Sequence, residues 1–278
     1  MVYQKIFCYC FFDTTSDATV ALAERIAGTE AAFVKLMNEK VKSYGLKNTV
    51  FKNSTGLDEE GHFSTAHDMA IIAKELLKHE EILEYSRVYE DYLRVNTPNK
   101  FWLVNTNKLV RFYEGADGLK TGFTDAAGYC MAVTSKRNGM RLIAIVLGEK
   151  VSKTRNEETT ELLDYGFNLY KVNLIKKKTD VIEEIKIEKG TKDKIKIMPK
   201  EDISILMKKS DVAINYDMET KLDNIKLPLK KGDVVGKLLL KDNNKIVKEV
   251  DLIANEDVKK INYALHLWNS FKSLITIN

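Results

Sequence analysis

Apolar residues recur at helical spacing near the start of the chain. They lie three or four positions apart from Ser16 to Ala27, and again from Thr29 to Tyr44. Thr29 is a hydroxyl residue suited to cap a helix N-terminus, and both runs are followed by a glycine, at Gly28 and Gly45, which is suited to end a helix. The pattern predicts two consecutive helices that pack as a pair.

The pattern then changes to short segments that are rich in β-branched and aromatic residues, with Gly, Pro and Asn between them. Such segments are typical of strands. A loop and a helix from Ser64 or Thr65 to Leu77 are predicted before them, and a helix from Asn156 to Tyr170 after them. The predicted strands are Tyr92–Val95, Phe101–Val104, Tyr129–Thr134 and Arg141–Leu147.

Lysines alternate with Ile or Val from about residue 172 onward, which is typical of half-buried strands. Their regular spacing predicts a small all-β sandwich over residues 172–254. The last twenty residues return to helical spacing, with an apolar stripe of Ile261, Leu265, Trp268 and Phe271. Such a helix either docks on its own domain or lies on a membrane surface.

The charge is nearly balanced, with 44 basic and 40 acidic residues and a formal net charge of +4. A mixed surface of this kind does not favour nucleic acid, because binding to phosphates needs a concentrated positive charge. The hydrophobic share of 44% and the charged share of 30% are those of an ordinary globular protein.

No metal or other cofactor is expected. The three cysteines, Cys8, Cys10 and Cys130, form no C-x-x-C pair, which argues against a disulfide framework and a zinc site. His62 and His67 are five positions apart with no third ligand in register, and the other two histidines, His79 and His266, lie far along the chain.

The sharpest local motif is Lys120-Thr121-Gly122. It is one of the motifs of class A β-lactamases and penicillin-binding proteins, in which lysine supplies a positive charge, threonine a hydroxyl donor, and glycine room for a close backbone approach. The tripeptide alone is weak evidence, since it is also compatible with an ordinary turn before a strand.

Its surroundings make the motif specific. Four stretches around it resemble the low-molecular-weight D-alanyl-D-alanine carboxypeptidases, the penicillin-binding proteins of peptidase S11 type, particularly those of spore-forming Gram-positive bacteria. The resemblance covers about residues 17–255. The stretches are Asp17–Gly28, Phe33–Glu39, Gly45–Leu57 and Phe101–Asn107.

The resemblance implies an α+β fold. It would contain an incomplete β-lactamase/transpeptidase-like domain at residues 14–171, the small all-β sandwich at 172–254 and an amphipathic C-terminal helix at 255–278, with residues 1–13 unmatched. It also implies a serine-type carboxypeptidase that removes the terminal D-alanine of peptidoglycan stem peptides through an acyl-enzyme, outside the cytoplasmic membrane. The expected partners are the stem peptide and β-lactams, with peripheral membrane contact through the C-terminal helix.

The chain departs from the family pattern in two places. No serine is followed three positions later by a lysine, so the family's S-x-x-K nucleophile and base are missing. At the S-x-N position the chain has Thr14 and Ser16. We therefore expect an N-terminally truncated and inactive catalytic domain, and the first residues show no recognisable secretory signal.

The resemblance also places Arg155 near the substrate carboxylate, together with Lys120, Thr121 and Gly122. A guanidinium suits this task because it binds a carboxylate with two parallel hydrogen bonds. The alternative is a surface arginine at the start of a helix.

Two other functional classes stay open. The first is a non-catalytic module that binds peptidoglycan or a partner protein. The second is a pseudogene fragment in which missing strands leave a sheet edge bare.

Overall fold

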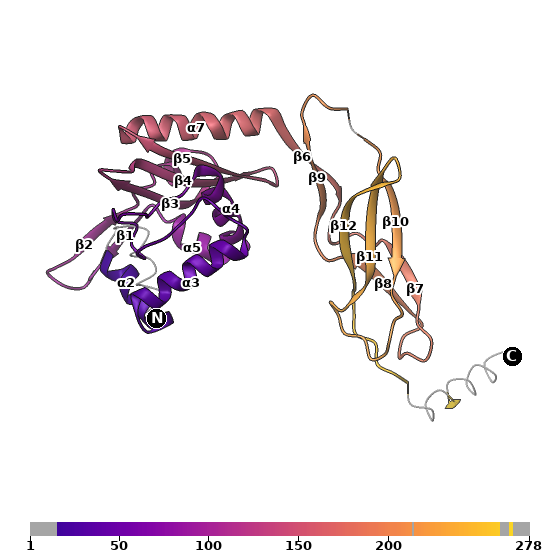
Figure 1. The fold of residues 1–278 in the computed structure, drawn as a ribbon. Coiled ribbons are helices and arrows are strands. Elements are labelled where there is room, and N and C mark those ends of the chain that lie inside the picture. Colours follow the sequence, from indigo (N-terminus) through magenta and orange to yellow (C-terminus); the bar gives the residue numbers. More distant parts are fainter. Residues whose placement is uncertain (1–15, 213, 262–266, 269–278) are drawn as a thin grey trace. The chain divides into compact units, whose positions relative to one another are not determined.

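The computed structural model describes residues 16–212, 214–261 and 267–268. The chain divides into two compact units, Met1–Tyr170 and Lys171–Asn278 (Figure 1). Each unit is described separately below.

The first unit begins with the two predicted helices, α2 (Ser16–Ala27) and α3 (Glu30–Ser43), which contact each other. Thr29 caps α3, and its hydroxyl accepts a hydrogen bond from the backbone N–H of Ala32 at 3.2 Å. Gly45 has φ +73°, a left-handed conformation that glycine adopts without strain. The predictions for both helices and for this cap are confirmed.

Three antiparallel strands form the larger sheet of this unit, in the order β3-β4-β5. They are β3 (Ala116–Thr124), β4 (Gly128–Arg137) and β5 (Met140–Glu149). Lys120-Thr121-Gly122 lies inside β3, so the alternative of a turn before a strand is wrong. The motif therefore has the extended backbone of a sheet edge.

Helices cover both faces of this sheet (Figure 1). On one face α7 (Ser152–Leu169) packs against β4 and β5, and on the other α4 (Ala66–Leu76) packs against β5 and α5 (Leu83–Ser86) against β3. The alternation of side chains along β5 fits this arrangement. Leu142 approaches Gly166 of α7, while Ile143 and Ile145 pack with Ala73, Ile82, Leu83 and Leu119.

Helix α7 begins at Ser152, four residues before the predicted start at Asn156. Its first turn is polar and so gives no periodic apolar signal. The helix is held to the segment before β3 by the Tyr113 hydroxyl, which donates to Asp164 Oδ1 at 2.6 Å. Burial, together with this carboxylate acceptor, raises the pKa of Tyr113. The Arg137 guanidinium lies over the Tyr113 ring, 4.3 Å from its centroid.

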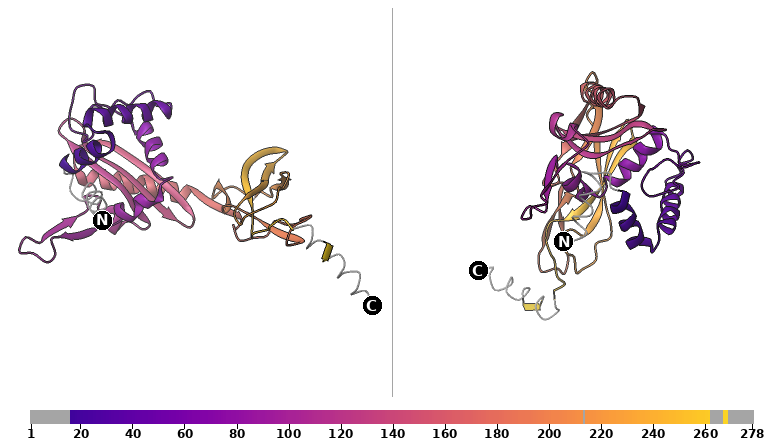
Figure 2. Two further views of the ribbon diagram at one scale, coloured as in Figure 1. Left: turned by 90° about the horizontal axis from the view of Figure 1, so that it is seen from below. Right: turned by 90° about the vertical axis from the view of Figure 1, so that its left-hand side faces the viewer.

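A hairpin projects from the first unit (Figures 1 and 2). Its strands β1 (Glu90–Leu93) and β2 (Phe101–Val104) pair antiparallel. The bounds of β2 agree with the prediction, whereas β1 starts two residues earlier than expected. Two short helical segments flank the hairpin, η1 (Glu80–Ile82) before α5 and α6 (Leu109–Phe112) after β2.

The second unit is a β-sandwich, as predicted. One sheet has the order β10-β11-β12-β8-β7, and β6 pairs with β9 in a second. Its core contains fully buried aliphatic residues, including Ile197, Leu240 and Leu252. The strands are β6 (Tyr170–Lys176), β7 (Glu183–Lys186), β8 (Lys194–Pro199), β9 (Ile203–Lys208), β10 (Asp217–Leu222), β11 (Val234–Asp242) and β12 (Lys245–Ala254).

Most of the C-terminal helix predicted over 255–278 lies outside the described residues. Its described beginning, 255–261, is not helical, since Val258 and Lys260 form isolated β-bridges with Leu229 and Gly190. Leu267 and Trp268 are described, and both are helical and exposed. Among the described residues, no helix has the length and apolar character needed to cross a bilayer.

Candidate functional site

The K-T-G segment occupies the outer edge of the sheet. Strand β3 pairs with β4 on one side, and no other described strand pairs with it on the other. Such an edge presents backbone N–H and C=O groups to which an extended peptide can bind. The side chain of Lys120 is half-buried, Thr121 is 7% exposed and Gly122 is exposed.

Gly122 is not required by packing. A Cβ atom added there would meet no atom within 4 Å. By contrast, one added at Gly118 of the same strand would lie 2.6 Å from the Ser86 hydroxyl oxygen. The space in front of Gly122 is therefore open to an approaching backbone.

Two polar side chains of the motif are held by near neighbours. Lys120 Nζ donates to the Thr121 carbonyl oxygen at 2.9 Å. The Thr121 hydroxyl oxygen lies 2.6 Å from that of Thr106, which follows β2 in a tight loop. Sequence patterns gave no sign of this second contact, because the two threonines are 15 residues apart and belong to different elements.

Arg155 lies in the first turn of α7 and is 5% exposed. The alternative of a surface arginine is therefore wrong. Its Nε and Nη2 atoms donate to Asn156 Oδ1 at 3.2 and 2.9 Å. Burial lowers the pKa of the guanidinium, an effect opposed by Cys130 and Tyr129. An arginine stays charged near neutral pH because its ordinary pKa is so high.

The sheet register brings Arg155 to the K-T-G end of β3. The guanidinium carbon is 5.9 Å from the ring centroid of Tyr129, and Tyr129 pairs with Phe123 across the β3–β4 ladder. The two rings are in contact, 4.3 Å between centroids and tilted by 34°. Cys130, the next residue of β4, pairs with Gly122. A buried cation thus lies over the strand that pairs directly with the motif.

The residues predicted at the S-x-N position are only partly described. Ser16 is the first residue of α2 and is half-buried, while Thr14 lies outside the described residues. Their role stays a prediction. Among the described residues no group of three or more His, Cys, Asp or Glu side chains could hold a metal ion.

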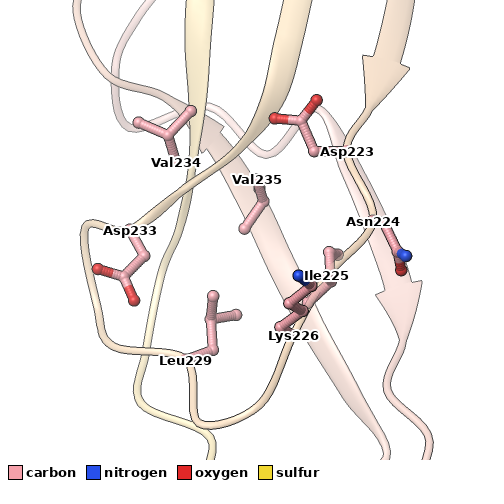
Figure 3. Close-up of a pocket in the computed structure, with 8 residues that line it drawn as sticks. All are labelled: Asp223, Asn224, Ile225, Lys226, Leu229, Asp233, Val234 and Val235. Carbon is pink, nitrogen blue, oxygen red and sulfur yellow. The ribbon is translucent and has the colours of Figure 1, made fainter.

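A pocket of about 480 Å³ occurs elsewhere, within the second unit (Figure 3). Its two carboxylates, Asp223 and Asp233, come from different segments of the wall, and Asp233 Oδ2 accepts a hydrogen bond from the Lys230 backbone N–H at 2.8 Å. That hydrogen bond closes a turn, so the carboxylate of Asp233 already has a structural role. None of the residues that line this pocket belongs to the predicted site.

Two family models match the chain. Residues 6–151 match the family described as D-alanyl-D-alanine carboxypeptidase. The chain belongs to this family. Residues 170–260 match the model described as penicillin-binding protein 5, C-terminal domain. The first match begins at residue 6, inside the segment 1–13 that was predicted to be unmatched.

Relatives in the D-alanyl-D-alanine carboxypeptidase family extend the match over most of the chain. DacF of Bacillus subtilis is 47% identical over 264 residues, which are 92% of this chain and 68% of DacF. The chain thus spans about two thirds of the length of that relative.

Solved structures of carboxypeptidases and penicillin-binding proteins share the fold. Penicillin binding protein 5 from Haemophilus influenzae has a TM-score of 0.63 at 31% identity, with 92% of this chain and 74% of that chain covered. Penicillin-Binding Protein D2 from Listeria monocytogenes, solved in a cefotaxime-bound form, has a TM-score of 0.54 at 34% identity, with 59% and 66% covered. The fold is thus a transpeptidase-like domain followed by a C-terminal β-sandwich.

Proposed function

We propose that the first unit holds the C-terminal D-Ala-D-Ala end of a peptidoglycan stem peptide along the outer edge of β3. The peptide backbone would add to the strand edge beside Gly122, and its terminal carboxylate would bind Thr121 with Lys120 and Arg155 nearby. The observation that carries this proposal is the K-T-G edge with the buried Arg155 at its end.

The charges suit a peptide that ends in a carboxylate. Two cations from different elements, Lys120 of β3 and Arg155 of α7, lie toward the same end of β3. Their attraction for an anion is stronger in a partly buried site than in water. The Listeria relative was solved in a cefotaxime-bound form, and cefotaxime also carries a carboxylate, which agrees with a ligand of this charge.

The proposed family reaction is the removal of the terminal D-alanine through an acyl-enzyme. That reaction needs a serine nucleophile and a base. No serine of the 278-residue sequence has a lysine three positions later, so none of its residues is assigned to this step. For the chain as given we propose substrate binding without acyl transfer, in a protein that acts outside the cytoplasmic membrane.

Binding and acylation are tested separately. Isothermal calorimetry with an N-acetylated tripeptide ending in D-Ala-D-Ala should show binding, and the same peptide with a C-terminal amide should bind much more weakly. Hydrogen bonds to charged groups contribute about 1.5–3 kcal/mol, so Lys120→Met and Arg155→Gln should each lower the affinity about 10- to 100-fold. Lys136→Met, at an exposed lysine of β4, is the matched control and should bind like the parent.

Fluorescent penicillin tests the second part on a denaturing gel. No covalent band is expected from the folded chain. Equal affinity for the carboxylate and amide peptides would overturn the proposed binding mode. A labelled band that maps to one residue would show that a nucleophile is present, and would contradict binding without acyl transfer.

A further inference from the structure

Thr106 occupies a position that core packing does not explain. Thr106 is exposed, yet its hydroxyl oxygen lies 2.6 Å from the hydroxyl oxygen of the buried Thr121. An exposed threonine with no packing role could be replaced by many residues. A hydroxyl at this distance is therefore best explained by what it does to Thr121.

The loop that carries Thr106 is fixed on both sides by buried asparagines. Asn105 is 1% exposed, and its Nδ2 donates to the carbonyl oxygens of Ser86 at 3.1 Å and Val88 at 2.9 Å. Its Oδ1 accepts the backbone N–H of Asn107 at 2.8 Å. The backbone before and after Thr106 therefore has little freedom to move.

Asn107 ties this loop to β3 itself. It is fully buried, and its Nδ2 donates to the Gly118 carbonyl oxygen at 3.1 Å, two residues before Lys120. Its Oδ1 accepts the Leu109 backbone N–H at 3.1 Å, which begins α6. Buried polar groups that are fully satisfied in this way rigidify their surroundings. The position of Thr106 is thus set relative to the motif strand.

The direction of the hydroxyl pair decides its consequence. Either oxygen can be the donor. If Thr121 donates to Thr106, its proton is not available to an anion. If Thr106 donates, the Thr121 proton is free to point at a carboxylate, and the hydrogen bond it receives strengthens the one it gives.

We infer that Thr106 is a positioning residue: it donates its hydroxyl hydrogen to Thr121 and so directs the Thr121 hydroxyl toward the bound carboxylate. The inference rests on the proposed function for the identity of the anion. The hydroxyl pair itself is tested without a peptide.

The first measurement tests whether Thr106 holds the Thr121 oxygen in place: it is the side-chain rotamer of Thr121, from three-bond couplings to its methyl carbon in the full chain. The donor direction is tested by the affinity measurement below, because loss of a donor at position 106 should weaken carboxylate binding and loss of an acceptor there should not. One rotamer is expected in the parent and in Thr106→Ser, which keeps the hydroxyl. Averaged couplings are expected in Thr106→Val, which has nearly the same shape without it. Unchanged couplings in Thr106→Val would overturn the inference, whether or not any peptide binds.

The second measurement is calorimetric affinity for the D-Ala-D-Ala tripeptide. Thr106→Val should weaken it about twofold to tenfold, the range for one neutral hydrogen bond, and Thr106→Ser should restore it. Thr134→Val is the control: it removes a buried hydroxyl of β4 that accepts from Arg141 Nη1 at 2.9 Å, so it perturbs stability without touching Thr121.

The outcomes separate the two proposals. An averaged Thr121 rotamer in Thr106→Val, with no peptide binding by the parent, supports the positioning role and overturns the proposed function. Peptide binding that Thr106→Val and Thr134→Val weaken equally overturns the positioning role and leaves the proposed function standing.

Discussion

At the scale of single residues, Asp68 of α4 is a buried carboxylate that several hydrogen bonds hold in place. It is 3% exposed and accepts the Thr49 hydroxyl at 2.8 Å and the Asn48 backbone N–H at 3.1 Å. Burial raises the pKa of this carboxyl, but the hydrogen bonds from Thr49, His67 and Asn48 outweigh it, so its pKa is lowered. The charged form is thus favoured by folding.

The lowered pKa of Asp68 determines how its contribution to the free energy of unfolding depends on pH. It is fully present above the carboxyl's unfolded pKa and is lost as pH falls through the folded pKa. Asp68→Asn should therefore lower the urea midpoint clearly at pH 7, and the difference from the parent should shrink below about pH 4. Asp125→Asn, at an exposed position of the β3–β4 turn, is the control. A difference that grows toward low pH would contradict the assignment.

The sequence predicted only part of the proposed site. Lys120, Thr121, Gly122 and Arg155 were predicted from the family motif and from one fixed offset, and their role stays a prediction. Thr106 was not predicted, since its contact with Thr121 depends on how a loop closes over another strand. Side-chain contacts of this kind leave no periodic signal.

At the scale of elements, the two glycines of β3 differ in the space that surrounds them. Gly118 faces Ser86, and an added Cβ would lie 2.6 Å from its hydroxyl oxygen, whereas Gly122 faces open space. Gly118→Ala should therefore destabilise the fold by about 1–3 kcal/mol. Gly122→Ala should leave the urea midpoint unchanged.

Gly122→Ala should weaken peptide binding although it leaves stability unchanged. An added methyl group would overlap a backbone that approaches the edge, at a cost of about 1–3 kcal/mol, so affinity for the D-Ala-D-Ala tripeptide should fall about fivefold or more. Urea unfolding and calorimetry on both variants check this pair of expectations. Full affinity in a folded Gly122→Ala protein would show that the peptide does not pass in front of this glycine.

The elements themselves were predicted unequally. Helices α2 and α3 carry caps and apolar periodicity that local residues determine, so their bounds were predicted well. The start of α7 was missed because Ser152–Arg155 is polar and its N-cap residue, Val151, makes no side-chain cap hydrogen bond. The strand character of K-T-G was missed because lysine, threonine and glycine in a row resemble a turn.

At the scale of the whole molecule, the change to alternating lysine and aliphatic residues near residue 172 predicted a second, all-β unit. The reason is physical: alternation with period two places one set of side chains in a core and the other in solvent. The buried residues of that core all come from the second unit, and they are aliphatic side chains such as Ile195, Ile197 and Leu240.

Separate cores predict that stability and binding can be changed independently. Leu240 is fully buried in the sandwich, so Leu240→Ala should destabilise the second unit by about 2–5 kcal/mol. Its unfolding transition should shift to lower urea, while the D-Ala-D-Ala affinity of the full chain, measured below that transition, should not change. Val247→Ala, at a 45% exposed position of β12, is the matched control with little expected effect. Loss of affinity in a folded Leu240→Ala protein would contradict the independence of binding and sandwich stability.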